Sequence, residues 1–140
     1  YIEVPKQRWD ITYHTHKFEK VGFPRMIFKY EAQNGSVKLM TIAAVKDNGM
    51  IKEDTEIFHF PFSHVDTSGY VCMGGNSFPQ IKSLQQISNF HVLFLSAPFG
   101  DDYGIKTTTK KGLRELFKEL SNQDFNDEWL LTKQNTFINL

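Results

Sequence analysis

The spacing of apolar residues changes along this 140-residue chain, and that change is the strongest constraint on its fold. Up to residue 60, apolar and polar residues alternate, which is typical of half-buried β-strands. From residue 80 onward, apolar residues recur every three or four positions, which is typical of amphipathic helices. Strands that come first and helices that follow predict an α+β fold, not a parallel βαβ sheet.

Turn signals divide the first part of the chain into strands. The pair Asn34-Gly35 is the strongest short hairpin signal known, and Asp47-Asn48-Gly49 predicts a second turn. These turns predict an antiparallel four-strand meander that ends at Pro61. Its strands are expected at residues 8–17, 26–32, 37–45 and 55–60.

An irregular stretch follows at residues 61–79, and helices are expected after it. The first predicted helix, residues 80–95, carries Ile81, Leu84 and Ile87 at helical spacing. The second, residues 110–121, has Thr109 as its expected N-cap. The apolar-rich tail at residues 125–140 is expected to pack back on the body. The apolar stripe of the second helix is Leu113, Leu116, Phe117 and Leu120.

Charge and length narrow the classes of protein further. The formal net charge is zero, which argues against a nucleic-acid or anionic-membrane partner. No apolar run approaches the ~18 residues of a membrane span, and no signal peptide is visible. We expect one domain over residues 1–140. The chain starts at Tyr1 and not at Met, which is compatible with an upstream segment outside this sequence.

Cys72 is the only cysteine, and it stands out within the irregular stretch. One cysteine excludes an internal disulfide and a cysteine zinc site, so a reducing cytoplasm is the expected compartment. The apolar pair Tyr70-Val71 leads from a polar turn to this thiol, and Gly74-Gly75 follows it. A thiol in such a place can face solvent or a partner. The competing interpretation is a buried, inert core cysteine.

The residues around Cys72 resemble the active-site motif of the ubiquitin-conjugating enzymes. That motif is His-Pro-Asn, a short linker, and then Gly-x-(Ile/Val)-Cys-Leu. The sequence Gly69-Tyr70-Val71-Cys72-Met73 fits its second part, and His64 stands where the motif has Asn. The resemblance implies the same α+β fold: a four-strand meander, an irregular cysteine segment and later helices.

A narrower similarity points to a divergent bacterial branch that includes PRTRC system protein B. The matching residues are Phe58-His59-Phe60-Pro61-Phe62-Ser63-His64 and Gly69-Tyr70-Val71-Cys72-Met73-Gly74-Gly75-Asn76. The similarity runs roughly from Pro24 to the C-terminus. It implies a bacterial pathway with a ubiquitin-like protein, a ThiF-like activating enzyme and a JAB-type peptidase as partners.

The resemblance also implies a chemistry. Cys72 would take the C-terminal acyl group of the ubiquitin-like protein as a thioester and pass it to an amine. His64 or Asn76 would donate a hydrogen bond to the developing oxyanion, or His64 would only stabilise the turn that holds the cysteine. Asp101 and Asp102, in the loop after the first helix, would orient the incoming amine, or would form a solvated turn.

No cofactor or metal is expected. His14 and His16 share a face of the first predicted strand, but no third ligand is evident, so a solvated face is the preferred interpretation. His59 is interpreted as a strand residue with a polar tip. Three functions stay open: a conjugating transferase, a binding module for a ubiquitin-like protein, and an unrelated α+β domain with a buried cysteine.

Overall fold

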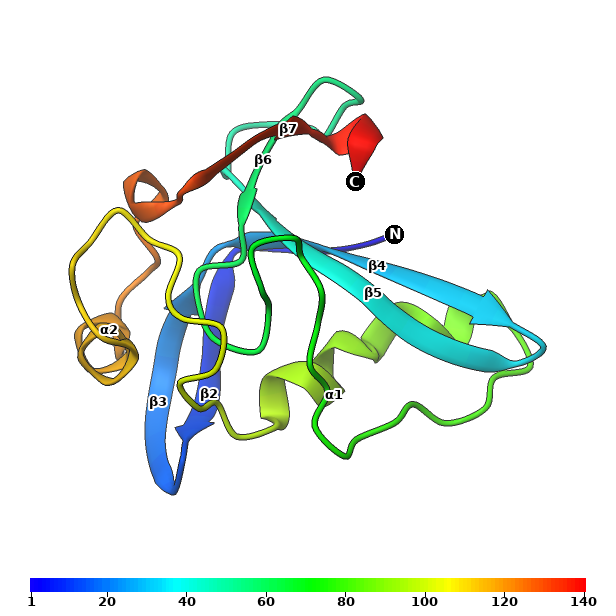
Figure 1. Cartoon of the computed structure of the whole chain (residues 1–140), viewed down its shortest axis with the longest axis horizontal. Helices are drawn as coiled ribbons and strands as arrows, with labels where there is room; N and C mark the ends of the chain where they lie inside the picture. Colours follow the sequence, from blue (N-terminus) through cyan, green and yellow to red (C-terminus); the bar gives the residue numbers. More distant parts are fainter.

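The computed structural model describes all 140 residues and has an α+β architecture, which confirms the predicted fold class. A five-stranded sheet has the spatial order β1-β4-β5-β6-β7, and β2 and β3 form a separate two-stranded sheet (Figure 1). All strand pairs in both sheets are antiparallel. The strands are β1 (Ile2–Val4), β2 (Gln7–Tyr13), β3 (His16–Phe23), β4 (Arg25–Gln33), β5 (Ser36–Val45), β6 (Glu56–His59) and β7 (Thr132–Thr136).

The hairpin between β4 and β5 is built as the sequence predicts. Gln33 pairs with Ser36, so Asn34 and Gly35 are the two loop residues. Both have left-handed backbone, with φ of 51° and 79°. Positive φ at both central residues is the requirement of a type I′ turn, which matches the twist of the flanking strands.

The predicted strand at residues 8–17 is wrong, because the chain reverses inside it. Tyr13 ends β2 and pairs with His16, which begins β3. His14 and Thr15 form the turn, and His14 has a φ of 50°. The alternation of side chains continues across a two-residue turn, and no glycine marks it, so the pattern concealed the reversal. The sheet is therefore not a four-strand meander: β4, β5 and β6 form its centre, and β1 and β7 flank them.

The predicted helix over residues 80–95 is also wrong in extent. A 3₁₀ helix, η1 (Leu84–Asn89), precedes a short α-helix, α1 (His91–Ser96). The side chain of Gln86 accepts hydrogen bonds from the N–H groups of Lys82 and Ser83, which fixes the start of η1. Leu84 is 71% exposed, so the spacing of apolar residues here does not correspond to one buried face.

The second helix, α2 (Leu113–Leu120), begins later than predicted. Gly112 is its N-cap, whereas Thr109 shares a hydrogen bond with Thr107. Its apolar stripe is buried as expected. The tail contains η2 (Asp127–Trp129), β7 and η3 (Phe137–Asn139), and β7 pairs with β6, so the tail does pack on the body. None of the helices is long and apolar enough to cross a membrane.

Phenylalanine side chains dominate the main core, which lies between the large sheet, the β2–β3 hairpin and the helices. Burying one such ring contributes ~1.5–3 kcal/mol. Phe62 packs on Phe23 and Phe117, and Phe94 packs on Phe60 and Phe99. These rings anchor both the chain entering the cysteine segment and the chain leaving α1, so the core fixes the two walls of the site.

Candidate functional site

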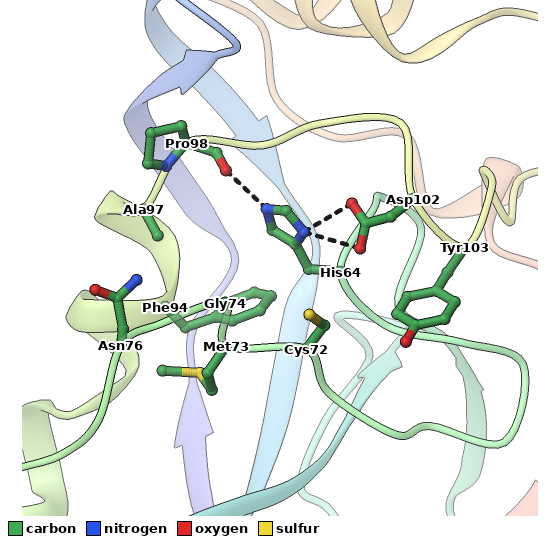
Figure 2. Close-up of a pocket in the computed structure, with 10 residues that line it drawn as sticks. All are labelled: His64, Cys72, Met73, Gly74, Asn76, Phe94, Ala97, Pro98, Asp102 and Tyr103. Carbon is green, nitrogen blue, oxygen red and sulfur yellow. Dashed lines mark hydrogen bonds and ion pairs between the residues drawn. The ribbon is translucent and has the colours of Figure 1, made fainter.

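A pocket of about 400 Å³ lies beside the only cysteine (Figure 2). Three segments form it: the irregular chain from His64 to Asn76, the end of α1 with the residues after it, and the loop that carries Asp102 and Tyr103. Cys72 is partly exposed and lines this pocket. The interpretation of Cys72 as a buried core residue is therefore wrong.

The segment that delivers Cys72 is a closed loop. The N–H of Cys72 donates to the carbonyl oxygen of His64 at 2.8 Å, and Val65 and Val71 form an antiparallel bridge. Inside the loop, the carboxylate of Asp66 accepts hydrogen bonds from the hydroxyl and N–H of Ser68. The Ser68 hydroxyl is the main cause of a lowered pKa of Asp66, and backbone N–H donors of the turn add to it. The loop thus holds Cys72 in place by its own hydrogen bonds.

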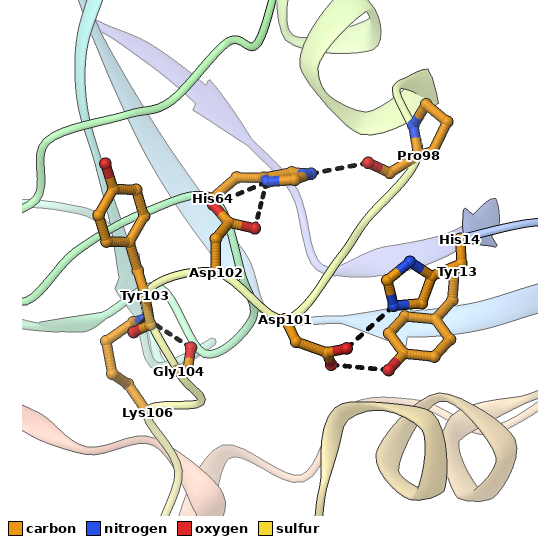
Figure 3. Close-up of polar contacts among 9 residues, drawn as sticks. All are labelled: Tyr13, His14, His64, Pro98, Asp101, Asp102, Tyr103, Gly104 and Lys106. Carbon is orange, nitrogen blue, oxygen red and sulfur yellow. Dashed lines mark hydrogen bonds and ion pairs between the residues drawn. The ribbon is translucent and has the colours of Figure 1, made fainter.

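The imidazole of His64 lies between two hydrogen-bond acceptors. Its Nε2 is 2.7 Å from the carbonyl oxygen of Pro98, and its Nδ1 is 2.8 Å from a carboxylate oxygen of Asp102 (Figure 3). Carbonyl and carboxylate oxygens accept hydrogen bonds, so both ring nitrogens of His64 face acceptors. The ring also stacks on Phe99 at 5.4 Å between centroids. His64 therefore connects the cysteine segment to the chain that follows α1.

Asn76 lines the same pocket at the end away from Cys72 and Tyr103 (Figure 2). Its side chain is exposed and forms no hydrogen bond within the protein. The N–H of Asn76 donates to the carbonyl of Met73, which closes a turn over Gly74, whose φ is 61°. The N–H groups of Met73, Gly74 and Gly75 form no hydrogen bond, so this turn holds free donors next to Cys72.

The two neighbouring aspartates point to different places. Asp102 lines the cysteine pocket, whereas Asp101 accepts from Tyr13 Oη at 2.6 Å and contacts His14 Nε2 at 2.9 Å (Figure 3). The hydrogen bond from Tyr13, followed by that from His14, lowers the pKa of Asp101. The structure thus brings His64, Cys72, Asn76 and Asp102 together, and it places Asp101 against the β2–β3 hairpin.

The remaining histidines lie apart from the pocket. His14 is in the turn and His16 is the first residue of β3, so the expected shared strand face is wrong. No group of three His, Cys, Asp or Glu side chains is placed to hold a metal. His59 ends β6, and its Nδ1 is buried without a partner. Burial, with the nearby charges of Lys133 and Lys106, lowers the pKa of His59.

Sequence reasoning missed three residues around the pocket. The ring of Tyr103 stands beside Cys72, Pro98 provides the carbonyl that His64 contacts, and Lys106 is buried behind the loop. Contacts between irregular segments more than 30 residues apart carry no periodic signal, so no pattern in the sequence marks these residues.

No curated protein and no solved structure matches this chain significantly. The model of one family, prokaryotic E2 family D, matches residues 4–132, which include every residue of the pocket. A match of this extent indicates a role of the ubiquitin-conjugation type. The chain therefore belongs to prokaryotic E2 family D.

Proposed function

We propose that this protein carries a ubiquitin-like protein as a thioester on Cys72 and passes it to an amine. The observation that carries the proposal is the position of Cys72: the only thiol of an E2-family chain lies, partly exposed, in a pocket. A thiolate is a good nucleophile, and a thioester stays reactive toward amines, so sulfur suits a carrier that must load and unload.

The reaction has two acyl transfers. In the first, the sulfur of Cys72 attacks the activated C-terminal carbonyl of the ubiquitin-like protein; a C–S bond forms and the bond to the activating enzyme's leaving group breaks. In the second, an amine attacks the thioester carbon; a C–N bond forms, the C–S bond breaks, and the amine loses a proton. Each step passes through a tetrahedral oxyanion that needs a hydrogen-bond donor, worth about 3 kcal/mol.

The geometry suggests how the other residues share the work. Both ring nitrogens of His64 are engaged, so we assign His64 to positioning the cysteine loop, not to the oxyanion. The free N–H groups that follow Cys72 and the unengaged amide of Asn76 are the donors that remain. The sequence suggested that Asp101 and Asp102 orient the incoming amine, and we assign this role to Asp102, because Asp102 lines the pocket whereas Asp101 accepts from Tyr13.

The proposed partners follow from the family and from the resemblance of the sequence. A ThiF-like enzyme would activate the ubiquitin-like protein, and a JAB-type peptidase would act in the same pathway. The cytoplasm is the proposed compartment, and one domain is the proposed organisation. The narrower placement near PRTRC system protein B stays a prediction.

The engagement of His64 also favours a second function, a module that binds a ubiquitin-like protein without chemistry. His64 stands where the motif of the ubiquitin-conjugating enzymes has Asn, and its ring is bound to Pro98 and Asp102. At that position no side chain is free to donate to the oxyanion.

A loading assay separates the two functions. The protein is mixed with its cognate activating enzyme, ubiquitin-like protein and ATP, and covalent adducts are followed on non-reducing gels. The carrier function predicts an adduct that a reducing thiol removes, because thiols exchange with thioesters and leave amides intact. Retained binding of the ubiquitin-like protein without any adduct would support the binding module instead.

A further inference from the structure

Lys106 is a buried amine that the proposed chemistry does not use. Only 4% of the residue is exposed, and its Nζ donates to two backbone carbonyls, those of Tyr103 at 3.2 Å and Gly104 at 3.0 Å (Figure 3). It forms no ion pair with a carboxylate. An ammonium buried in this way is costly unless its hydrogen bonds are satisfied, so a specific role for it is expected.

The two carbonyls belong to an unusual turn. Tyr103 and Gly104 both have left-handed backbone, with φ of 60° and 66°. This conformation is natural for glycine but unfavourable for tyrosine, because its Cβ approaches the following carbonyl. Two successive residues of this kind persist only when their surroundings hold them. The ammonium of Lys106, which donates a hydrogen bond to each of these two carbonyls, is the group that holds them.

This turn places the residues that form one wall of the cysteine pocket. Asp102 precedes the turn and contacts the imidazole of His64, and the backbone carbonyl of His64 accepts from the N–H of Cys72. The ring of Tyr103 stands next to Cys72 (Figure 2). Lys106 is also fixed on the other side, since its own N–H donates to the carbonyl of Pro61 at 2.9 Å, just before the cysteine segment.

We infer that Lys106 is a positioning residue that fixes the turn at residues 102–104 over Cys72, and so controls access to the thiol. Its effect on acyl transfer rests on the proposed function, whereas its effect on access to Cys72 does not. The side chain of Lys106 is buried and does not contact Cys72.

The charge of this amine changes near neutral pH. Burial lowers the pKa of Lys106 to about 8, partly opposed by Asp102 and then Asp66. Above that pH the neutral amine keeps two N–H groups for the two carbonyls, and its burial no longer desolvates a charge. Opening the turn exposes the amine and returns its pKa toward the ordinary value of 10.5, so the closed turn should become more stable as pH rises above 8. The titratable groups that interact with Lys106 are Asp102, Asp66 and His59, and Lys133 lies near His59.

The test is the rate at which a small thiol reagent, iodoacetamide, alkylates Cys72 between pH 6 and pH 9. The variants are Lys106→Met, Lys106→Arg, which keeps a charge at all these pH values, and Lys110→Met as an exposed control. At pH 7 Lys106→Met should react about fivefold faster than the wild type, the effect of losing one hydrogen bond of ordinary strength. The ratio should rise at pH 9, because the wild-type turn is then held closed by an amine that has lost its charge. Lys106→Arg cannot lose its charge, so the ratio of the Lys106→Met rate to the Lys106→Arg rate should be the same at pH 7 and pH 9.

A ratio of one at pH 7, or a ratio that does not rise between pH 7 and pH 9, would overturn the inference. If the Lys106 variants do not fold, hydrogen exchange of the wild type decides. After correction for the intrinsic rise in exchange, the Lys106 amide, bonded to Pro61, should gain protection between pH 7 and pH 9, and unchanged or lower protection would overturn the inference. These measurements need no partner protein, so their outcome does not depend on the outcome of the loading assay.

Discussion

The Nδ1 atom of His64 lies 2.8 Å from a carboxylate oxygen of Asp102, and this contact joins two loops that are 38 residues apart in the sequence. The other ring nitrogen contacts the carbonyl of Pro98. Through these contacts His64 forms part of the structure that holds Cys72, whose N–H donates to the backbone carbonyl of His64.

His64→Ala should lower the free energy of unfolding by about 2 kcal/mol, because it removes two hydrogen bonds and places alanine at a φ of 71°. His64→Asn should cost less, since asparagine tolerates left-handed backbone. Urea unfolding followed by circular dichroism measures both. His16→Ala is the control, because the His16 side chain is exposed and forms no hydrogen bond, and it should change stability by less than about 0.5 kcal/mol. Equal costs for the His64 and His16 variants would contradict the role given to His64.

Asp102→Asn and Asp101→Asn form a matched pair for the second transfer step. Asp102 lines the pocket, so its neutralisation should slow discharge of the thioester to free lysine by about tenfold through loss of orientation. Asp101 is directed to Tyr13 and His14, so its neutralisation should leave discharge within about twofold of the wild type. Single-turnover discharge of purified thioester measures both rates. If Asp101→Asn slows discharge more than Asp102→Asn does, Asp101 and not Asp102 orients the amine.

The buried amine of Lys106 should make stability depend on pH. The folded protein releases this proton near pH 8, whereas the unfolded chain keeps it up to its ordinary value of 10.5. Between these values the unfolded chain binds more protons, so the free energy of unfolding should rise with pH, by up to ~3 kcal/mol. The Lys106→Met variant lacks this contribution. Urea unfolding from pH 7 to pH 10.5 should show that the free energy of unfolding of the wild type increases relative to that of Lys106→Met. A difference between the two free energies that does not change with pH would show that Lys106 titrates normally.

Gly22→Ala tests the packing of β3 against the end of α2. A Cβ at this position would lie 2.2 Å from the carbonyl oxygen of Gln123 and 2.5 Å from the backbone nitrogen of Phe125. Backbone atoms cannot move aside easily, so the substitution should cost ~2 kcal/mol or more. Gly112→Ala, where no atom lies within 4 Å, should cost less than about 1 kcal/mol. Thermal and urea unfolding of the two variants compare them directly.

The sequence predicted those parts of the fold that depend on local chemistry. Asn34-Gly35 specified its turn because left-handed backbone strongly favours these residues. The turn at His14-Thr15 escaped prediction because its residues carry no such preference and the alternation continues across it. Residues 80–95 were misread because Ile81 and Ile87 pack in a small separate cluster, whereas Leu84 faces solvent.

For the candidate site, the sequence could point to residues that stand out locally. Cys72 was predicted because it is the only cysteine, and His64 because it stands where the resembled motif has Asn. The contacts of His64 with Asp102 and Pro98, and the burial of Lys106, depend on how distant irregular segments pack. Packing of this kind leaves no period or motif, so Asp101 and Asp102 could not be told apart before the structure.

The most direct test of the proposed carrier function is the intact mass of the protein after loading with the activating enzyme, ubiquitin-like protein and ATP. The wild type should gain the mass of one ubiquitin-like protein less one water, and a reducing thiol should remove it. Cys72→Ser should either form a thiol-resistant oxyester or fail to load, because a hydroxyl is a weaker nucleophile than a thiolate at neutral pH. Cys72→Ala should not load. An adduct that survives reducing thiol in the wild type, or that persists in Cys72→Ala, would contradict the thioester at Cys72.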